Sequence, residues 1–149
     1  MSDFHQNGVI STLHNLSNRS LDEIESELRE YSKQAPIELI LPCLFSELQG
    51  AALKKIVSCL SEVKYLNHIT IGLDKANKSE FREAKKFFST LNQAHTVIWN
   101  DSPKMKALNN DFSKLGISPD QPGKGKNVWY CMGYTFSRNE AKSIALHDC

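Results

Sequence analysis

The sequence predicts an α/β fold with a mostly parallel sheet that has helices on both of its faces. Short apolar runs alternate with helix-length segments, and most of those segments carry an apolar stripe at helical spacing. A length of 149 residues suits one domain with a substantial core. No apolar run approaches the roughly 20 residues that span a bilayer. The formal net charge of +1 gives no reason to expect nucleic acid or a membrane as partner.

The N-terminal part, residues 1–36, is expected to form a helical segment. A first short helix is suggested by its apolar residues, which are Val9, Ile10, Leu13 and Leu16. A second helix is predicted to begin after Ser20, whose side chain can form a capping box with Glu23. Its apolar stripe consists of Leu21, Ile24, Leu28 and Tyr31. The Ala35-Pro36 pair ends this helix, because a residue before proline avoids the helical conformation.

Four apolar runs are predicted to be the strands of the sheet: residues 37–41, 68–73, 95–99 and 143–146. Helices are predicted between them. They lie around residues 53–60, over 80–91, from the Ser102-Pro103 pair to Gly116, and around 128–136 after a loop rich in proline and glycine over 118–125. This alternation predicts a single α/β domain over residues 37–149.

The carboxyl ends of these strands are the candidate functional positions, because ligands bind there in open α/β sheets. The first strand runs into Leu41-Pro42-Cys43-Leu44-Phe45-Ser46-Glu47, and the second into Asp74. The third runs into Asn100-Asp101 and the fourth into Asp148. Carboxylates in these places suit a ribose, a metal or a base edge. We interpret Asp101 as a cap of the following turn, whereas for Asp74 capping and binding stay equally open.

The segment Pro122-Gly123-Lys124-Gly125-Lys126 is the other candidate. Glycines let a backbone approach a phosphate closely, and a lysine between them offers a mobile positive charge. The helix that follows adds its positive N-terminal end. A lone Gly-Lys-Gly motif is weak support, and it is not a Walker loop, which needs more residues between its glycines and Ser or Thr after its lysine.

The four cysteines, Cys43, Cys59, Cys131 and Cys149, include no C-x-x-C pair, which argues against a structural zinc site. We expect Cys59 and Cys131 to be packed inertly in the interior. The first residues lack the basic and apolar regions of a signal peptide, so we expect a cytoplasmic protein without disulfides.

Together these segments resemble glucosyl-3-phosphoglycerate synthase-like family 2 glycosyltransferases, over nearly the whole chain. The resemblance depends on the ordered combination of Leu41 to Glu47, Ile71-Gly72-Leu73-Asp74, Trp99-Asn100-Asp101, Pro122-Gly123-Lys124-Gly125 and Leu146-His147-Asp148. It implies a type A glycosyltransferase fold with a Rossmann-like sheet. It also implies a nucleotide-sugar donor such as UDP-glucose, Mg²⁺ or Mn²⁺, and transfer of a hexose to a small acceptor such as 3-phosphoglycerate.

The resemblance also implies roles for individual residues. The Pro42-Cys43-Leu44 loop would cradle the base and ribose with Glu47 nearby, and Asp74 would lie near the uracil or ribose. Lys124 would balance the charge of the diphosphate. Asp148 would be the first acid of a metal-binding Asp-x-Asp motif, whose second acid would follow the last residue, Cys149. We therefore expect a donor-binding half that is incomplete at its C-terminus, with no transfer activity of its own and an exposed sheet edge that promotes self-association. No catalytic residue is assigned.

Two other classes stay open. One is a nucleotide-binding remnant or a small α/β binding module without catalysis, such as a receiver-like domain. A receiver needs acidic residues at the end of its first strand for metal-assisted phosphorylation, whereas the first strand here ends in Leu41-Pro42. The other is an enzyme with a nucleophilic site at His147-Asp148-Cys149. Adjacent strand residues point to alternate faces, so these three cannot converge as a relay, and His147 is expected to be packed or to support a neighbour.

Overall fold

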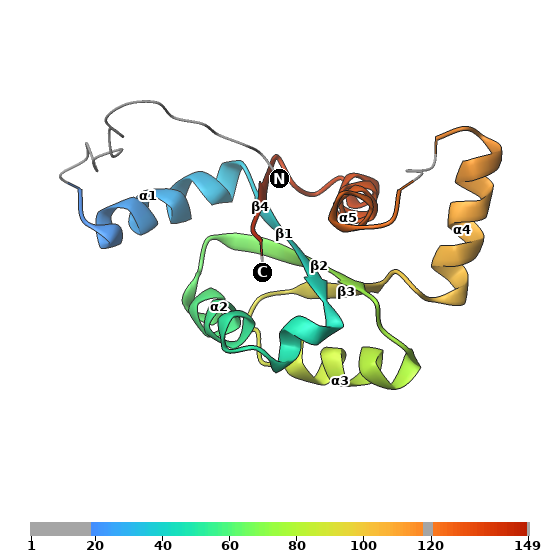
Figure 1. Cartoon of the computed structure of the whole chain (residues 1–149). Coiled ribbons are helices and arrows are strands. Elements are labelled where there is room, and N and C mark those ends of the chain that lie inside the picture. The colour runs from blue at the N-terminus through green and yellow to red at the C-terminus, as the bar shows by residue number, and fades with distance from the viewer. Residues whose placement is uncertain (1–18, 118–120, 149) are drawn as a thin grey trace, which may run out of the picture.

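The computed structural model describes residues 19–117 and 121–148, which form a parallel sheet with helices on both faces (Figure 1). In chain order the elements are α1 (Leu21–Gln34), β1 (Ile37–Leu44), the 3₁₀ helix η1 (Phe45–Gln49), α2 (Ala51–Glu62), β2 (Leu66–Asp74), α3 (Lys78–Phe88), β3 (His95–Trp99), α4 (Pro103–Lys114), α5 (Lys124–Arg138) and β4 (Ser143–Leu146). The first predicted helix, with Val9 and Leu13, lies outside the described residues, as do Ser118 and Cys149.

The sheet has the strand order β3-β2-β1-β4, and all of its strand pairs are parallel. This confirms the predicted α/β class with a Rossmann-like parallel sheet. The chain moves outward from β1 through β2 to β3 and then returns to the other side of β1 with β4. The strand order therefore reverses between β1 and β4, and α/β folds bind their ligands beyond the strand ends at such a switch point.

One face of the sheet holds the main apolar core, under α2 and α3 (Figure 1). Alternate side chains of β1 and β2 point to this face, as the two-residue period of a strand requires. They are Leu39, Leu41 and Cys43 from β1, and Ile69, Ile71 and Leu73 from β2. The helices contribute apolar residues at helical spacing, which are Leu53 and Val57 of α2 and Ala84 and Phe88 of α3.

The opposite face, under α5, is more polar. The fully buried Glu38 of β1 accepts hydrogen bonds from the hydroxyls of Thr70 and, at 2.7 Å, Thr135 of α5. His68 of β2 is also buried, and its pKa is lowered by burial and then by the nearby charge of Arg138. Strands that are covered on both faces are usually largely apolar. The buried polar cluster under α5 was not predicted from the sequence.

The helix starts predicted at Ser20 and at Ser102 are confirmed by their caps. The Ser20 hydroxyl accepts the N–H of Glu23, and the Glu23 carboxylate accepts the N–H of Ser20 at 2.8 Å, which completes the capping box. The Ser102 hydroxyl accepts the N–H of Met105 at the start of α4. Gly116 follows the end of α4 with a φ of 70°, a conformation that suits glycine after a helix.

Two predicted element boundaries at the carboxyl edge of the sheet were wrong, the end of β1 and the start of α5. Pro42-Cys43-Leu44 is not a loop, because β1 continues to Leu44 and pairs there with Asp74 of β2. Proline has no N–H to donate to a neighbouring strand. It is tolerated at position 42 because β4 pairs with β1 only as far as Ile40, so no hydrogen bond between Pro42 and β4 is lost. The helix α5 begins at Lys124, four residues before the predicted start, after a turn in which Gly123 has a φ of 137°.

The expectation for one cysteine was also wrong. Cys59 is exposed on α2, because it lies off the stripe on which Leu53 and Val57 are buried. Cys131 is buried beneath α5 as expected, and burial, reinforced by the charge of Glu38, raises the pKa of its thiol to about 12. Cys131 is therefore a packed thiol that stays protonated at neutral pH.

The strand β4 lies at one edge of the sheet and is largely exposed, in agreement with the exposed sheet edge expected from the sequence. Among the described residues it pairs with β1 alone, and 51% of the Leu146 surface is accessible. No helix in the described part of the chain has the length and apolar character needed to cross a membrane.

We expect this edge to promote self-association, because an unpaired apolar strand edge is a template for another chain. Leu146→Lys should shift the sedimentation coefficient toward the monomer by placing a charge on the edge. Leu115→Lys makes the same change at an exposed leucine remote from the sheet edge and should leave the distribution unchanged. A wild-type chain that sediments as a monomer at all concentrations would contradict the prediction.

Candidate functional site

A cavity of about 240 Å³ lies at the carboxyl edge of the sheet, where the strand order reverses. Its walls include all seven residues to which the sequence analysis gave a binding role: Pro42, Cys43, Leu44, Glu47, Asp74, Lys124 and Asp148. These residues come from four separate segments of the chain. The fold thus brings the predicted residues together, while their binding roles remain predictions.

The wall at the end of β1 is held by a local hydrogen bond. The Glu47 carboxylate accepts the backbone N–H of Leu44 at 2.6 Å, which fixes the turn from β1 into η1. Cys43 is buried in the core beneath this wall, and its thiol contacts the carbonyl oxygen of Leu41 at 3.6 Å. Pro42 and Leu44 therefore form the cavity surface here, and Cys43 supports them with a small side chain.

The opposite wall is the N-terminal turn of α5. Lys124 is the first residue of this helix, so its ammonium group adds to the positive end of the helix dipole. The Lys124 ammonium forms an ion pair with the Asp148 carboxylate, with the two side chains 50% and 71% exposed. Exposed pairs of this kind contribute about 0–1 kcal/mol, so an anionic ligand can displace Asp148 from Lys124 at small cost.

Asn127, which was not predicted as a site residue from the sequence, holds α5 against the sheet by a hydrogen bond to β2. It is 3% exposed, and its Nδ2 group donates a hydrogen bond of 2.8 Å to the carbonyl oxygen of Gly72. The close approach is possible only because Gly72 has no side chain: a Cβ there would lie 1.8 Å from the Asn127 Oδ1 atom. A glycine inside a predicted strand is a signal of such an approach and was the clue available in the sequence.

Asp74 lies at the end of β2, between this cavity and a second one described below. Burial raises the pKa of its carboxyl group, and the neighbouring negative charge of Asp101 raises it further. Asp101 does not cap its own turn as predicted. Its carboxylate accepts the backbone N–H of Ala76 at 3.0 Å and so ties the β3–α4 connection to the loop after β2.

The described residues contain no cluster of three or more His, Cys, Asp or Glu side chains able to enclose a metal ion. Asp148 contributes a single carboxylate. The neighbouring His147 is exposed, so of the two roles expected for it, packed or supporting a neighbour, the packed one is wrong. A single carboxylate fits Mg²⁺, which proteins commonly hold through one or two carboxylates together with the phosphates of a substrate. Asp148 is thus suited to a cation that arrives with a phosphorylated ligand.

The fold and this cavity define a Rossmann-like α/β domain with a lysine-bearing helix N-terminus at its switch point. No family model and no solved structure matches the chain. Two curated relatives do. A glucosyl-3-phosphoglycerate synthase of Persephonella marina is 46% identical over all 149 residues, and one of Methanococcoides burtonii is 31% identical over 147 residues, 98% of the chain.

The chain is therefore similar over its whole length to glucosyl-3-phosphoglycerate synthases. It spans 37% and 35% of the length of these two relatives, so it corresponds to little more than a third of either protein.

Proposed function

We propose that the chain forms the donor-binding part of a glycosyltransferase, with the nucleoside diphosphate of a nucleotide sugar in the cavity at the ends of β1 and β2. One observation carries the proposal: seven residues chosen from the sequence, from Pro42 to Asp148, line a single cavity at the N-terminus of α5. A helix N-terminus with an adjacent lysine is suited to bind phosphate.

In this proposal Lys124 and the first turn of α5 bind the diphosphate. Pro42 and Leu44 offer an apolar surface to the base and ribose, and Glu47 lies close enough to accept a ribose hydroxyl with the carboxylate oxygen that the Leu44 N–H does not use. Asp74 closes the cavity on the β2 side, near the base or ribose.

A divalent cation, Mg²⁺ or Mn²⁺, would bind to Asp148 and to oxygens of the diphosphate. When bound, it would neutralise charge on the diphosphate leaving group. With a cation held by Asp148, the ion pair between Asp148 and Lys124 would open, and the Lys124 ammonium would be available to the phosphates.

The sugar and the acceptor are proposed from the relatives. Their name, glucosyl-3-phosphoglycerate synthase, describes proteins that make a glucosylated 3-phosphoglycerate. We propose UDP-glucose as the donor and 3-phosphoglycerate as the acceptor of the whole protein to which these residues correspond. The residues that bind the acceptor are not assigned.

The proposal is tested by replacing Lys124 with alanine. Loss of one charge-assisted contact costs about 1.5–3 kcal/mol, so Lys124→Ala should weaken UDP binding roughly tenfold or more. Isothermal titration calorimetry with UDP at a fixed MgCl₂ concentration measures the change.

Lys85→Ala is the matched control, because Lys85 is an exposed lysine on α3, outside the cavity. It should leave the affinity unchanged. Equal affinities for the wild type and Lys124→Ala would remove Lys124 from the site, and a wild-type chain that binds no UDP would refute the proposed function.

A further inference from the structure

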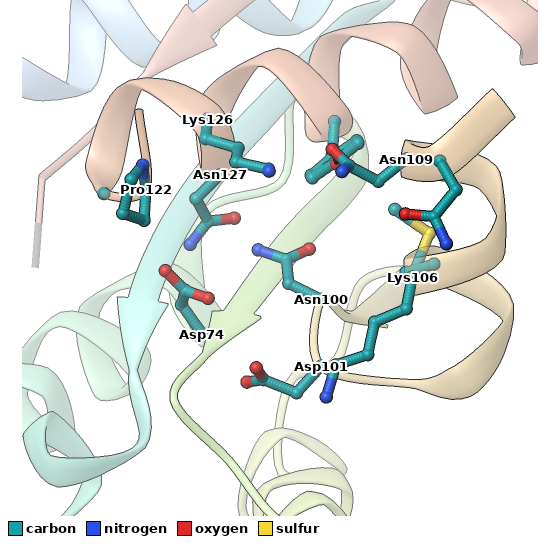
Figure 2. A pocket seen from close by; sticks show the side chains of 12 residues that line it. Asp74, Asn100, Asp101, Lys106, Asn109, Pro122, Lys126 and Asn127 are labelled. Carbon is teal, nitrogen blue, oxygen red and sulfur yellow. Dashed lines mark hydrogen bonds between the residues drawn. The ribbon is translucent and has the colours of Figure 1, made fainter. Parts of the chain in front are cut away.

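A second cavity, of about 390 Å³, adjoins the candidate site at the same edge of the sheet (Figure 2). Asp74, Gly123 and Asn127 line both cavities, so the two are direct neighbours. The second cavity extends toward the end of β3 and toward α4. Of the residues given a binding role from the sequence, only Asp74 lines it, so it is a space to which no role has been assigned.

Asn100, at the end of β3, is held in the middle of this second cavity. Its backbone N–H donates a hydrogen bond of 3.0 Å to the carbonyl oxygen of Leu73, the residue before Asp74. Figure 2 shows the Asn100 amide between Asp74 and Asn127 on one side and Asn109 on the other, with its nitrogen toward Asp74 and Asn127. Its side chain therefore lies next to the wall that the two cavities share.

The hydrogen bonding of Asn100 is incomplete. Its Oδ1 atom is buried and has no hydrogen-bond partner among the described residues. By contrast, the amide of Asn127 bonds to Gly72, and the Asn109 amide oxygen accepts the hydroxyl of Tyr130. The Nδ2 group of Asn100, by contrast, is not among the buried unpaired atoms and lies on the side of Asp74 and Asn127, so it is the part of the amide that a ligand crossing the shared wall would meet.

The size of the first cavity indicates which ligand group reaches Asn100. About 240 Å³ is less than the roughly 300–1,000 Å³ of typical sites for small molecules. A nucleoside diphosphate therefore needs additional space, and the second cavity offers it across Asp74. With the diphosphate at Lys124 and the ribose near Glu47, the edge of the base farthest from the ribose is the part that extends beyond Asp74.

We propose that Asn100 determines base specificity by donating a hydrogen bond from its amide nitrogen to a carbonyl oxygen on that edge of the base. Uracil presents a carbonyl at its position 4, where cytosine presents an amino group, so this donor favours uridine over cytidine nucleotides. The inference rests on the proposed function, because it requires the diphosphate to bind in the first cavity.

The test compares UDP, CDP and inorganic pyrophosphate by calorimetry at a fixed MgCl₂ concentration. The wild type should bind UDP about tenfold more tightly than CDP. Asn100→Asp should reverse the preference, because a carboxylate accepts a hydrogen bond from the amino group of cytosine and repels the uracil carbonyl. Asn100→Leu should bring the UDP/CDP ratio close to one and leave pyrophosphate affinity unchanged.

Asn110→Asp is the matched control, because it places the same charge in the same cavity without replacing the proposed donor. It should keep the UDP/CDP ratio of the wild type. The ratio is the decisive quantity, since an added charge changes the affinities for both nucleotides alike. If Asn100→Asp does not fold, Asn100→Leu gives the answer.

A UDP/CDP ratio that is the same in the wild type, Asn100→Asp and Asn100→Leu would overturn the role of Asn100, while the proposed function would stand. A wild type that binds pyrophosphate but no UDP would overturn the proposed function, and the inference with it. A wild type that binds neither UDP nor pyrophosphate would overturn the proposed function itself, and the inference with it.

Discussion

Gly72→Ala is expected to lower the free energy of unfolding by about 3 kcal/mol or more. The added Cβ would lie 1.8 Å from the Asn127 Oδ1 atom and 2.5 Å from the Cys131 Sγ atom, far inside van der Waals contact. Both side chains are buried under α5, so the helix must move away from β2 and the Asn127–Gly72 hydrogen bond must lengthen. Overpacking typically costs about 1–3 kcal/mol, and loss of the hydrogen bond adds roughly 1 kcal/mol. Thermal and urea unfolding measure the loss, expected as a fall in Tm of about 10 °C.

Gly133→Ala is the control for this prediction. Gly133 lies within α5, and an added Cβ there meets nothing within 4 Å. The same substitution should therefore be neutral or stabilise the chain by up to about 1 kcal/mol, because alanine favours the helix. A comparable destabilisation at Gly133 and Gly72 would show that the effect is not caused by the contact with Asn127 and Cys131.

A double-mutant cycle isolates the contribution of Asn127. Removing its side chain relieves the shortest clash but leaves the one with Cys131. Gly72→Ala should therefore cost at least about 1 kcal/mol less in the Asn127→Ala background than in the wild type. Equal costs in the two backgrounds would exclude the Asn127 side chain as the origin of the destabilisation.

The Gly72 substitution should also weaken ligand binding, since α5 carries Lys124 into the candidate site. If α5 moves away from β2, the Lys124 ammonium and the helix N-terminus move away from the end of β1. We expect the folded fraction of Gly72→Ala to bind UDP several-fold more weakly than the wild type. Gly72 thus couples the packing of the sheet to the geometry of the site.

Much of this architecture could be predicted from sequence because local patterns specify it. The apolar runs of β1, β2 and β3 and the caps at Ser20 and Ser102 depend on residues close together in the chain. The rule that parallel sheets bind ligands at their carboxyl edge then selects Asp74 and Asp148 without further information. Their convergence on one cavity follows from the strand order, in which β1 lies between β2 and β4.

The parts that sequence reasoning missed depend on contacts between distant segments. In the sequence Asn127 has no feature that distinguishes it from other helix residues. Its role depends on the hydrogen bond to Gly72, 55 positions earlier in the chain. Pro42 predicts the end of a strand, but the pairing with β2 extends β1 to Leu44. From the sequence Asn100 is predicted to be a turn residue. Only its backbone hydrogen bond to Leu73 and its position in the second cavity make it a candidate for base recognition.

Glu38→Ala is expected to have the other large effect, a loss of about 3–5 kcal/mol in the free energy of unfolding. Glu38 is fully buried in β1, and its carboxylate accepts the hydroxyls of Thr70 and Thr135, with the Arg138 Nε atom 3.9 Å away. Removing the carboxylate leaves two buried hydroxyls without their acceptor and opens a cavity in the interior, two changes that together are strongly destabilising. Urea unfolding measures it, with Glu62→Ala at the exposed end of α2 as the control, expected within about 0.5 kcal/mol of the wild type.

The cause can be tested by replacing the whole hydrogen-bonded group. Glu38→Met combined with Thr70→Val and Thr135→Val removes the acceptor and both donors while keeping most of the volume. Apolar replacements of buried polar groups are often near neutral, so this triple variant should be more stable than Glu38→Ala. A triple variant that is as unstable as Glu38→Ala would attribute the loss to packing rather than to unpaired polar groups.

The two large effects should differ in their consequence for the site. Glu38 lies near the start of β1, six residues or about 20 Å of strand before Leu44 at the cavity. Its bond to Thr135 holds the C-terminal half of α5, whereas the bond between Asn127 and Gly72 holds the turn that carries Lys124. Folded Glu38→Ala should therefore bind UDP within about twofold of the wild type, although it is as unstable as Gly72→Ala. Equal losses of affinity in the two variants would mean that α5 moves as one rigid body, and the assignment of the Asn127–Gly72 contact as the local determinant of Lys124 position would then be wrong.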